Sequence, residues 1–250
     1  MTPILETRGL GRAFGALQAV ADLNLDVPPG ELRAVIGPNG AGKTTLFHLI
    51  SGLLPPTSGR VRFRGDDVTA LAAPARCRRG ISRTFQITSI FPELTVLENV
   101  RVAVQLKRGG NFRLVGGRPL LEATERRARE SLGFLGLLDR AGAPAATLPH
   151  GDQRLLEIAM ALAQEPELLL LDEPTQGLSP EDTAATVAVI RGIARDRRLT
   201  IVLVEHDMDV VFDLADRISV LHFGRLIAEG TPDEIRANAE VQTAYLGGLE

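Results

Sequence analysis

Hydrophobic residues near the N-terminus alternate with polar ones, which is typical of half-buried antiparallel strands. Leu23, Leu25 and Val27 follow this alternation, and a Pro-Pro-Gly turn at 28–30 leads into an apolar run over 32–36. The period then changes. After the glycine-rich segment 37–42, apolar residues recur at helical spacing over 43–51, so the pattern predicts a strand, a glycine loop and a helix. Further strands are expected over 60–64 and near 81–85.

Residues 87 to about 165 have mostly helical periodicity. Thr95 and Glu98 resemble a capping box at the start of a helix that carries Val100, Val104 and Leu106. Two more amphipathic stretches cover 120–138 and 152–163, and loop-forming residues occupy 108–119. This block is therefore predicted to be a helical region.

From residue 166 onward, a strand followed by a helix occurs twice. Apolar runs at 168–171 and 200–204 precede helical patterns at 180–195 and 207–215, and late strands are expected at 217–221 and 226–229. Ser179, followed by a proline and two acidic residues, is a strong helix start. Such alternation predicts an α/β fold with a mostly parallel sheet covered by helices, preceded by an antiparallel β region.

Composition excludes several classes of protein. With 250 residues and 44% hydrophobic content, the chain can bury a large core, so disorder and fibrous repeats are excluded. The net charge of −3 includes no block of like charge at either end, which predicts no nucleic-acid partner. Because Cys77 is the single cysteine and the N-terminus lacks a basic region followed by a long apolar stretch, we expect a reducing, cytoplasmic compartment. The longest apolar runs are far shorter than the roughly 20 residues of a membrane-spanning helix.

The glycine-rich segment carries the most specific chemistry. Residues 37–44 match the pattern G-x-x-x-x-G-K-[ST] between a strand and a helix, where backbone N–H groups surround phosphate oxygens. The chain contains 26 arginines and only two lysines, so the lysine at position 43 suggests a need for a compact charge at the β and γ phosphates. Thr44 would also bind Mg²⁺. The alternative is an ordinary glycine-rich turn. The expected nucleotide-binding residues are Gly37, Pro38, Asn39, Gly40, Ala41, Gly42, Lys43, Thr44 and Thr45.

Two other apolar strands end in polar residues. Asp172 and Glu173 follow the run 168–171, and His206 follows 201–204. Ligands gather at the carboxyl ends of parallel strands, so we expect Asp172 to face Mg²⁺ and Glu173 to act on the attacking water. His206 is expected to contact the γ phosphate or that water. Taken alone, the acidic pair could be a solvated turn, and His206 a surface or core residue.

Three further features are less specific. Gln86 closes a strand and could reach both the metal ion and the water, or it could simply mark a boundary. Phe14 could stack on adenine or belong to the core. The basic run Arg76, Arg78, Arg79 and Arg83 is expected to be a solvated helix face.

Together these motifs resemble the nucleotide-binding subunit of an ATP-binding cassette (ABC) transporter over nearly the whole chain. Residues 37–44 resemble the Walker A loop, and 168–173 resemble the Walker B strand with Glu173 as catalytic glutamate. Gln86 corresponds to the Q-loop and His206 to the switch histidine. Residues 148–153 stand in the place of the signature segment. The resemblance implies that Gly151 binds the γ phosphate held by a second subunit in a head-to-tail dimer.

Two positions depart from the family pattern. Pro149 replaces the usual serine of the signature segment and has neither a hydroxyl nor an N–H to donate. Because of this loss, Pro149 suggests a slow ATPase. The segment 178–181, in turn, lacks the usual aspartate of the D-loop.

Other segments narrow the subfamily. Residues 80–86, 91–100, 151–153 and 205–208 are similar to ATPase subunits of branched-chain amino acid importers, and urea and amide importers look much alike. The resemblance implies a P-loop NTPase (RecA-like) core at 1–86 and 166–250 with an antiparallel β subdomain, and a helical subdomain at 87–165. It also implies ATP and Mg²⁺ as cofactors, a second ATP-binding subunit in a homo- or heterodimer, transmembrane permease subunits and a solute-binding protein. The chain would lie on the inner face of the cell membrane.

Two other functions stay open at this stage. A soluble ABC ATPase acting on nucleic acid or ribosomes would predict a basic stripe, a coiled-coil arm or a second cassette, and the sequence shows none of these. A weakly hydrolysing regulator is favoured by Pro149 but opposed by Glu173 and His206.

Overall fold

A computed structural model describes residues 2–84, 90–107, 117–197 and 199–246 of the chain. Its centre is a six-stranded sheet in the order β10-β9-β3-β8-β7-β6, in which β10 pairs antiparallel with β9 and the other pairs are parallel. The strands are β3 (Leu32–Ile36), β6 (Ile81–Arg83), β7 (Leu168–Asp172), β8 (Thr200–Val204), β9 (Arg217–His222) and β10 (Arg225–Gly230). The parallel strands β3, β7 and β8 therefore end at the same edge of the sheet.

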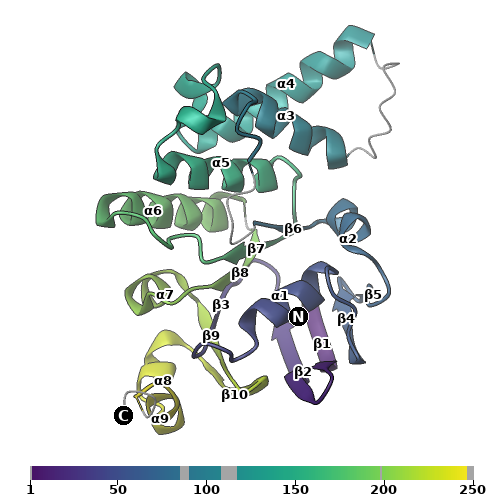
Figure 1. Ribbon diagram of the computed structural model, residues 1–250, viewed down its shortest axis with the longest axis vertical. Coiled ribbons are helices and arrows are strands. Elements are labelled where there is room, and N and C mark those ends of the chain that lie inside the picture. The colour runs from purple at the N-terminus through teal and green to yellow at the C-terminus, as the bar shows by residue number, and fades with distance from the viewer. Residues whose placement is uncertain (1, 85–89, 108–116, 198, 247–250) are drawn as a thin grey trace.

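A second sheet is antiparallel and has the order β2-β1-β4-β5. It contains β1 (Leu5–Phe14), β2 (Leu17–Val27), β4 (Ser58–Phe63) and β5 (Asp66–Asp67), and lies beside α1 (Lys43–Ser51) (Figure 1). The antiparallel β region predicted from the alternation near the N-terminus is confirmed.

The remaining helices lie beside the central sheet or in a group of their own (Figure 1). Helices α3, α4 and α5 lie together at the end of the molecule that is uppermost in Figure 1, while α8 and α9 lie near the opposite end. Their bounds are α2 (Ala73–Arg79), α3 (Val96–Lys107), α4 (Gly117–Phe134), α5 (His150–Leu162), α6 (Pro180–Arg197), α7 (Met208–Leu214), α8 (Pro232–Arg236) and α9 (Ala239–Leu246). Thr95 and Glu98 form the predicted capping box, because each backbone N–H donates to the other residue's side chain. The limits of the helical subdomain at 87 and 165 stay a prediction.

Alternate residues of the parallel strands face two different cores. Leu168, Leu170, Val202 and Val204 pack in the cluster that contains α1 and the antiparallel sheet. Leu169, Leu171, Ile201 and Leu203 pack in the larger cluster formed with the helices on the other face. Burial on both faces explains why these strands read as continuous apolar runs.

The basic run at 76–83 differs from the expected solvated helix face. Arg78 and Arg79 are exposed, but Arg76 is buried and donates to the carbonyls of Leu49 and Ile50 in the last turn of α1. Those carbonyls lack partners within their own helix, and the guanidinium supplies donors to them. Burial lowers the pKa of Arg76 to about 10, so it stays charged at neutral pH. Arg83 lies on β6 after the helix has ended, and its side chain is also buried. The prediction was therefore wrong for Arg76 and Arg83.

Candidate functional site

The glycine loop connects β3 to α1, and its backbone lies directly against neighbouring segments. A Cβ atom at Gly37 would be 2.2 Å from the carbonyl oxygen of Leu221, and one at Gly42 would be 2.4 Å from that of Ala19. Gly42 also has a φ of +101°, in the region that favours glycine. Side chains are thus excluded at both positions by backbone atoms that cannot move aside easily. The loop keeps one compact shape because of these contacts.

Lys43 is the first residue of α1 and its side chain turns back over the loop. Its Nζ donates to the carbonyl oxygens of Gly37, at 2.7 Å, and Pro38, at 3.1 Å. Burial lowers the pKa of Lys43, and the nearby charges of Glu173 and Asp172 oppose that shift. Thr44 is exposed and Thr45 is half-buried in the same first turn. The N-cap residue, Gly42, has no side chain that could accept hydrogen bonds from the N–H groups of this turn. The N-terminus of α1 therefore presents N–H groups and a positive dipole end beside an ammonium group, which suits a phosphate.

Asp172 is the last residue of β7 and is fully buried. Its Oδ2 accepts a hydrogen bond from Nη2 of Arg83 at 2.7 Å. Its Oδ1 has no hydrogen-bond partner in the described part of the chain. A buried carboxylate oxygen without a donor is costly unless something binds it, and carboxylate oxygens are ligands that Mg²⁺ prefers. Asp172 thus fits the metal role predicted for it.

Glu173 and His206 meet at the ends of the neighbouring strands β7 and β8. Oε1 of Glu173 lies 3.0 Å from Nε2 of His206, and the Glu173 backbone N–H donates to the carbonyl of Val204. Glu173 has a φ of +49°, a strained value for a residue other than glycine. Its side chain is 7% exposed and that of His206 is 44% exposed, so the pair reaches from the buried sheet edge to solvent. The predicted catalytic pair is therefore brought together by the fold.

Glu205 directly follows β8 and connects the same two strand ends. Its carboxylate accepts hydrogen bonds from the backbone N–H of Thr175 at 3.0 Å, from the Thr175 hydroxyl, and from the N–H of His206 at 2.8 Å. The two bonds from Thr175 join segments 30 residues apart in the sequence, whereas the third joins adjacent residues. The histidine's backbone position is thus tied to the turn that follows Glu173.

The signature segment forms the start of α5. Pro149 is its N-cap residue and is exposed, and Gln153 donates to the carbonyl of Leu148. Gly151 is buried in the first turn, and a Cβ atom there would be 2.8 Å from Cγ of Asp182 at the start of α6. Contact within the chain therefore already disfavours a side chain at 151, apart from any role toward a second subunit.

Gln86 and Phe14 are the two other residues predicted to contact the nucleotide or its metal ion. Gln86 is outside the described residues. Phe14 is 44% exposed, so it does not belong to the core, and the Arg12 guanidinium lies 4.7 Å from the centre of its ring. Its alternative interpretation as a core residue is wrong, while adenine stacking stays a prediction.

The sequence did not predict the two buried arginines that contact Asp172 and the backbone of Glu173. Arg83 pairs with Asp172, and Arg154 on α5 donates to the carbonyls of Glu173 and Pro174. A signal for Arg154 was present, because it occupies the apolar face of α5 three residues before another charged residue, Glu157. Charged residues at buried helical positions are normally paired.

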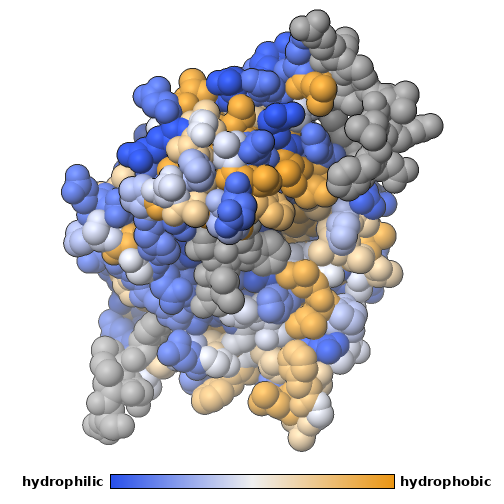
Figure 2. Space-filling model, turned by 45° about the horizontal axis from the view of Figure 1, so that its top comes forward, coloured by the Kyte–Doolittle hydropathy of each residue, from blue (hydrophilic) through white to orange (hydrophobic). Residues whose placement is uncertain are grey.

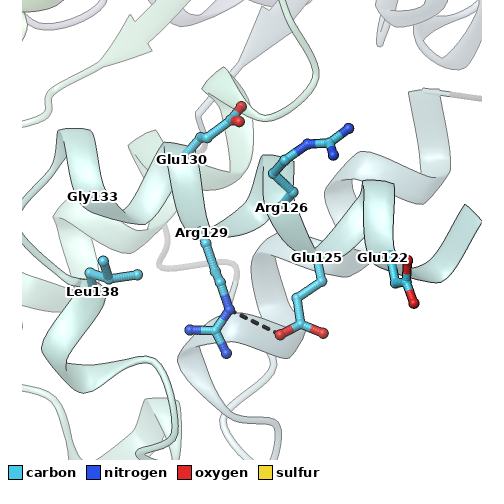
Figure 3. A pocket seen from close by; sticks show the side chains of 7 residues that line it. All are labelled: Glu122, Glu125, Arg126, Arg129, Glu130, Gly133 and Leu138. Atoms are coloured by element: carbon cyan, nitrogen blue, oxygen red, sulfur yellow. Dashed lines mark hydrogen bonds and ion pairs between the residues drawn. The ribbon is translucent and has the colours of Figure 1, made fainter. Parts of the chain in front are cut away.

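Two hollows are lined by neither Glu173 nor His206. One, of about 600 Å³, is formed by loop residues 38–41 together with residues of the β9–β10 turn and α9, including the exposed Phe223. The other, of about 660 Å³, lies along α4, where Arg129 and Glu125 form an ion pair (Figure 3). Its charged lining is typical of a solvated helix surface.

A glycine loop between a strand and a helix, with carboxylates at the end of a nearby parallel strand, defines a P-loop nucleotide-binding ATPase. The profile described as "ABC transporter" matches residues 20–176. The chain therefore belongs to the ABC transporter family, and it is an ATP-binding, ATP-hydrolysing subunit that works with permease subunits. A second profile, "Branched-chain amino acid ATP-binding cassette transporter", matches residues 225–249.

Relatives and solved structures agree with this assignment over nearly the full length. The chain is 42% identical over 250 residues to the high-affinity branched-chain amino acid transport ATP-binding protein LivG of Escherichia coli (strain K12), covering 98% of each chain. It is 41% identical over 251 residues, again with 98% coverage of both, to BraF of Pseudomonas aeruginosa, which has the same description. An ATP-binding cassette of an ABC transporter in its ADP conformation superposes with a TM-score of 0.87 at 28% identity, covering 99% of this chain and 100% of that one. A nucleotide-free cassette gives a TM-score of 0.86 at 28% identity, with 97% and 98% covered. The fold class predicted from the sequence is confirmed.

Within the described residues, the helices are too short or too polar to cross a membrane.

Proposed function

We propose that the chain is the ATPase subunit of an importer for branched-chain amino acids. The relatives LivG and BraF are named for high-affinity transport of these solutes, and the profile that matches the C-terminal segment carries the same description. These relatives are transport proteins, which gives no support to a soluble ATPase with a non-transport role. We further propose that the chain works on the cytoplasmic face of the membrane, with a solute-binding protein that delivers the amino acid to the permease subunits.

The contact between Glu173 and His206 beside the Walker A loop carries the mechanism. Lys43 and backbone N–H groups of the glycine loop and the first turn of α1 would hold the β and γ phosphates, and Glu173 would orient a water molecule and accept its proton. His206, 3.0 Å from that carboxylate, would stabilise the charge that develops on the γ phosphate. Phe14 would stack on adenine, and Gln86 would contact the metal ion and the water.

Asp172 and Thr44 would hold the magnesium ion that accompanies ATP. Bound Mg²⁺ offsets the negative charge of the β and γ phosphates. The buried Oδ1 of Asp172, which lacks a hydrogen-bond partner among the described residues, supports this assignment.

The complete site would form between two ATP-binding subunits, with Gly151 of one chain at the γ phosphate held by the other. The exposed side chains of Phe91, Leu106, Leu121 and Leu138 support the presence of partner chains, because exposed apolar groups often mark protein contacts. Figure 2 shows several apolar patches among the charged residues of the helical end.

The Glu173→Gln variant tests the hydrolytic mechanism. The amide retains the size of the side chain but cannot accept the proton, so we expect turnover to fall about 10²- to 10⁴-fold while ATP binding is kept. A matched control is Glu181→Gln, which changes an exposed glutamate at the start of α6. Wild-type turnover in Glu173→Gln would contradict the assignment.

Transport assays test which solute the importer carries. The chain would be purified with its membrane subunits, reconstituted into proteoliposomes, and supplied with ATP and labelled leucine, urea or a short-chain amide. We expect ATP-dependent uptake of leucine in competition with isoleucine and valine. Uptake of urea or the amide without leucine would reassign the importer to one of the similar-looking subfamilies.

A further inference from the structure

Arg154 projects from α5 into the turn that follows β7. Its side chain is 5% exposed, and its Nη2 donates to the carbonyl oxygen of Glu173 at 2.7 Å. Its Nε donates to the carbonyl of the next residue, Pro174, at 3.2 Å. The helix that begins with the signature segment thus contacts the backbone of the predicted catalytic glutamate.

These two hydrogen bonds hold the peptide units directly after a strained residue. A φ of +49° at Glu173 costs on the order of 1–3 kcal/mol and persists only where surrounding contacts fix it. On the other side, the Glu173 N–H donates to the carbonyl of Val204 at 2.8 Å. Because the guanidinium is a rigid, planar group, it can fix two successive carbonyls at once. The backbone of Glu173 is held on both sides, and its carboxylate is directed toward His206.

Glu157 orients the guanidinium from within the same helix. Its Oε2 lies 2.7 Å from Nη1 of Arg154, and its side chain is 4% exposed. A buried ion pair of this kind adds little to stability, because desolvation of both charges offsets their attraction, and apolar residues of similar size often fold as well. The pair therefore calls for a role other than stability.

We propose that Arg154 is a positioning residue for ATP hydrolysis, acting through the backbone of Glu173. It keeps the glutamate in the left-handed conformation that brings the carboxylate to His206. The proposal rests on the hydrolytic role proposed for Glu173. Displacing a reacting group by about 1 Å can reduce a rate by 10²-fold, so loss of Arg154 should affect turnover without affecting nucleotide binding.

Three variants of the full chain separate this role from stability. Arg154→Met combined with Glu157→Leu replaces the ion pair by apolar groups and removes both carbonyl contacts. Arg154→Lys retains the charge and can keep one contact. Arg129→Lys makes the same change at an exposed arginine on α4 and serves as the matched control. Thermal unfolding followed by circular dichroism checks that each variant is folded, and Arg154→Lys carries the test if the double variant is not.

The expected result is a split between kcat and nucleotide affinity. In the double variant, kcat should fall about 10- to 100-fold while the Kd for a fluorescent ATP analogue changes less than about twofold. Arg154→Lys should recover part of the loss, and Arg129→Lys should stay within about threefold of wild type. A kcat within threefold of wild type in both folded Arg154 variants, or an equal loss of kcat and affinity, would overturn the proposal.

A double-mutant cycle with Glu173 tests the route of the effect. If Arg154 acts through Glu173, adding the double variant to Glu173→Gln should change the residual turnover less than about twofold, whereas independent residues would show the full additional loss. The full additional loss would refute the positioning role of Arg154 and leave the proposed function of the chain intact. Wild-type turnover in Glu173→Gln by itself would instead refute the proposed function, and the positioning role with it.

Discussion

The glycine loop and the strand-end carboxylates, which we propose to hold the same nucleotide, are built in different ways. Lys43 bonds to carbonyls five and six residues away, within the glycine loop itself. Glu173 contacts a histidine 33 residues away, and Asp172 pairs with an arginine 89 residues away. The hydrogen bonds of Lys43 are thus local, although the loop also lies against Leu221 and Ala19, while the contacts of Asp172 and Glu173 exist only once the whole sheet and its helices have assembled. Substitutions should consequently act differently in the glycine loop and at the carboxylates.

Arg83→Met should have the largest effect, because it removes the partner of a fully buried carboxylate. Leaving Asp172 buried without its ion-pair partner is expected to cost about 3–5 kcal/mol of unfolding free energy. Arg78→Met changes an exposed arginine on α2 and should stay within about 0.5 kcal/mol. Urea denaturation of both variants measures the difference. Equal stability would show that Asp172 does not depend on this distant partner.

Lys43→Met should leave the fold intact and weaken nucleotide binding instead. The loss of charge-assisted contacts to phosphate is expected to raise the Kd for ATP about 100-fold. Lys107→Met provides the control, because the only other lysine donates to the carbonyl of Glu165 on the helical side of the molecule. Isothermal titration calorimetry gives both constants. A Kd within threefold of wild type for Lys43→Met would remove the lysine from the phosphate site.

Gly37→Ala tests whether close contact with β9 determines the glycine at this position of the loop. A Cβ atom 2.2 Å from a backbone carbonyl cannot be accommodated without displacing β9, so we expect a loss of about 2–3 kcal/mol. Gly40→Ala also has a positive φ, of +81°, but no atom within 4 Å of the added Cβ, and should cost only about 1 kcal/mol. Chemical denaturation of the two variants compares them directly. The same loss in both would mean that conformation, rather than close contact, determines the glycine at 37.

Gly133→Ala should have the smallest effect and the opposite sign. This glycine lies near the end of α4, is exposed, and has open space around the position of a Cβ atom. Replacing it should raise the unfolding free energy by about 0.5–1 kcal/mol, since alanine has the higher helix propensity, and leave ATP turnover unchanged. A destabilised variant, seen by differential scanning calorimetry, would indicate a contact at α4 that the structure does not show.

The same contrast explains what the sequence could predict. The Walker A loop, the alternation of strands and helices, and the capping box at Thr95 depend on residues close together in the chain, and all of these were predicted correctly. The approach of Glu173 to His206 was predicted because parallel strands end at one edge of a sheet. The supporting roles of Arg83 and Arg154 were not. Arg154 had a local signal in its place on the apolar face of α5, but in a chain with 26 arginines nothing local marked Arg83 as the partner of Asp172.

Arg76 illustrates what a buried guanidinium can do far from the reaction. It caps the carboxyl end of the helix whose amino end carries Lys43, with bonds of 2.6 and 2.8 Å to the carbonyls of Leu49 and Ile50. A short helix that is fixed at its carboxyl end is expected to move as a rigid body. Movements of the segment around α2 would then displace α1 and the glycine loop together. A conformational change after hydrolysis could thus be passed between the glycine loop and a surface remote from ATP.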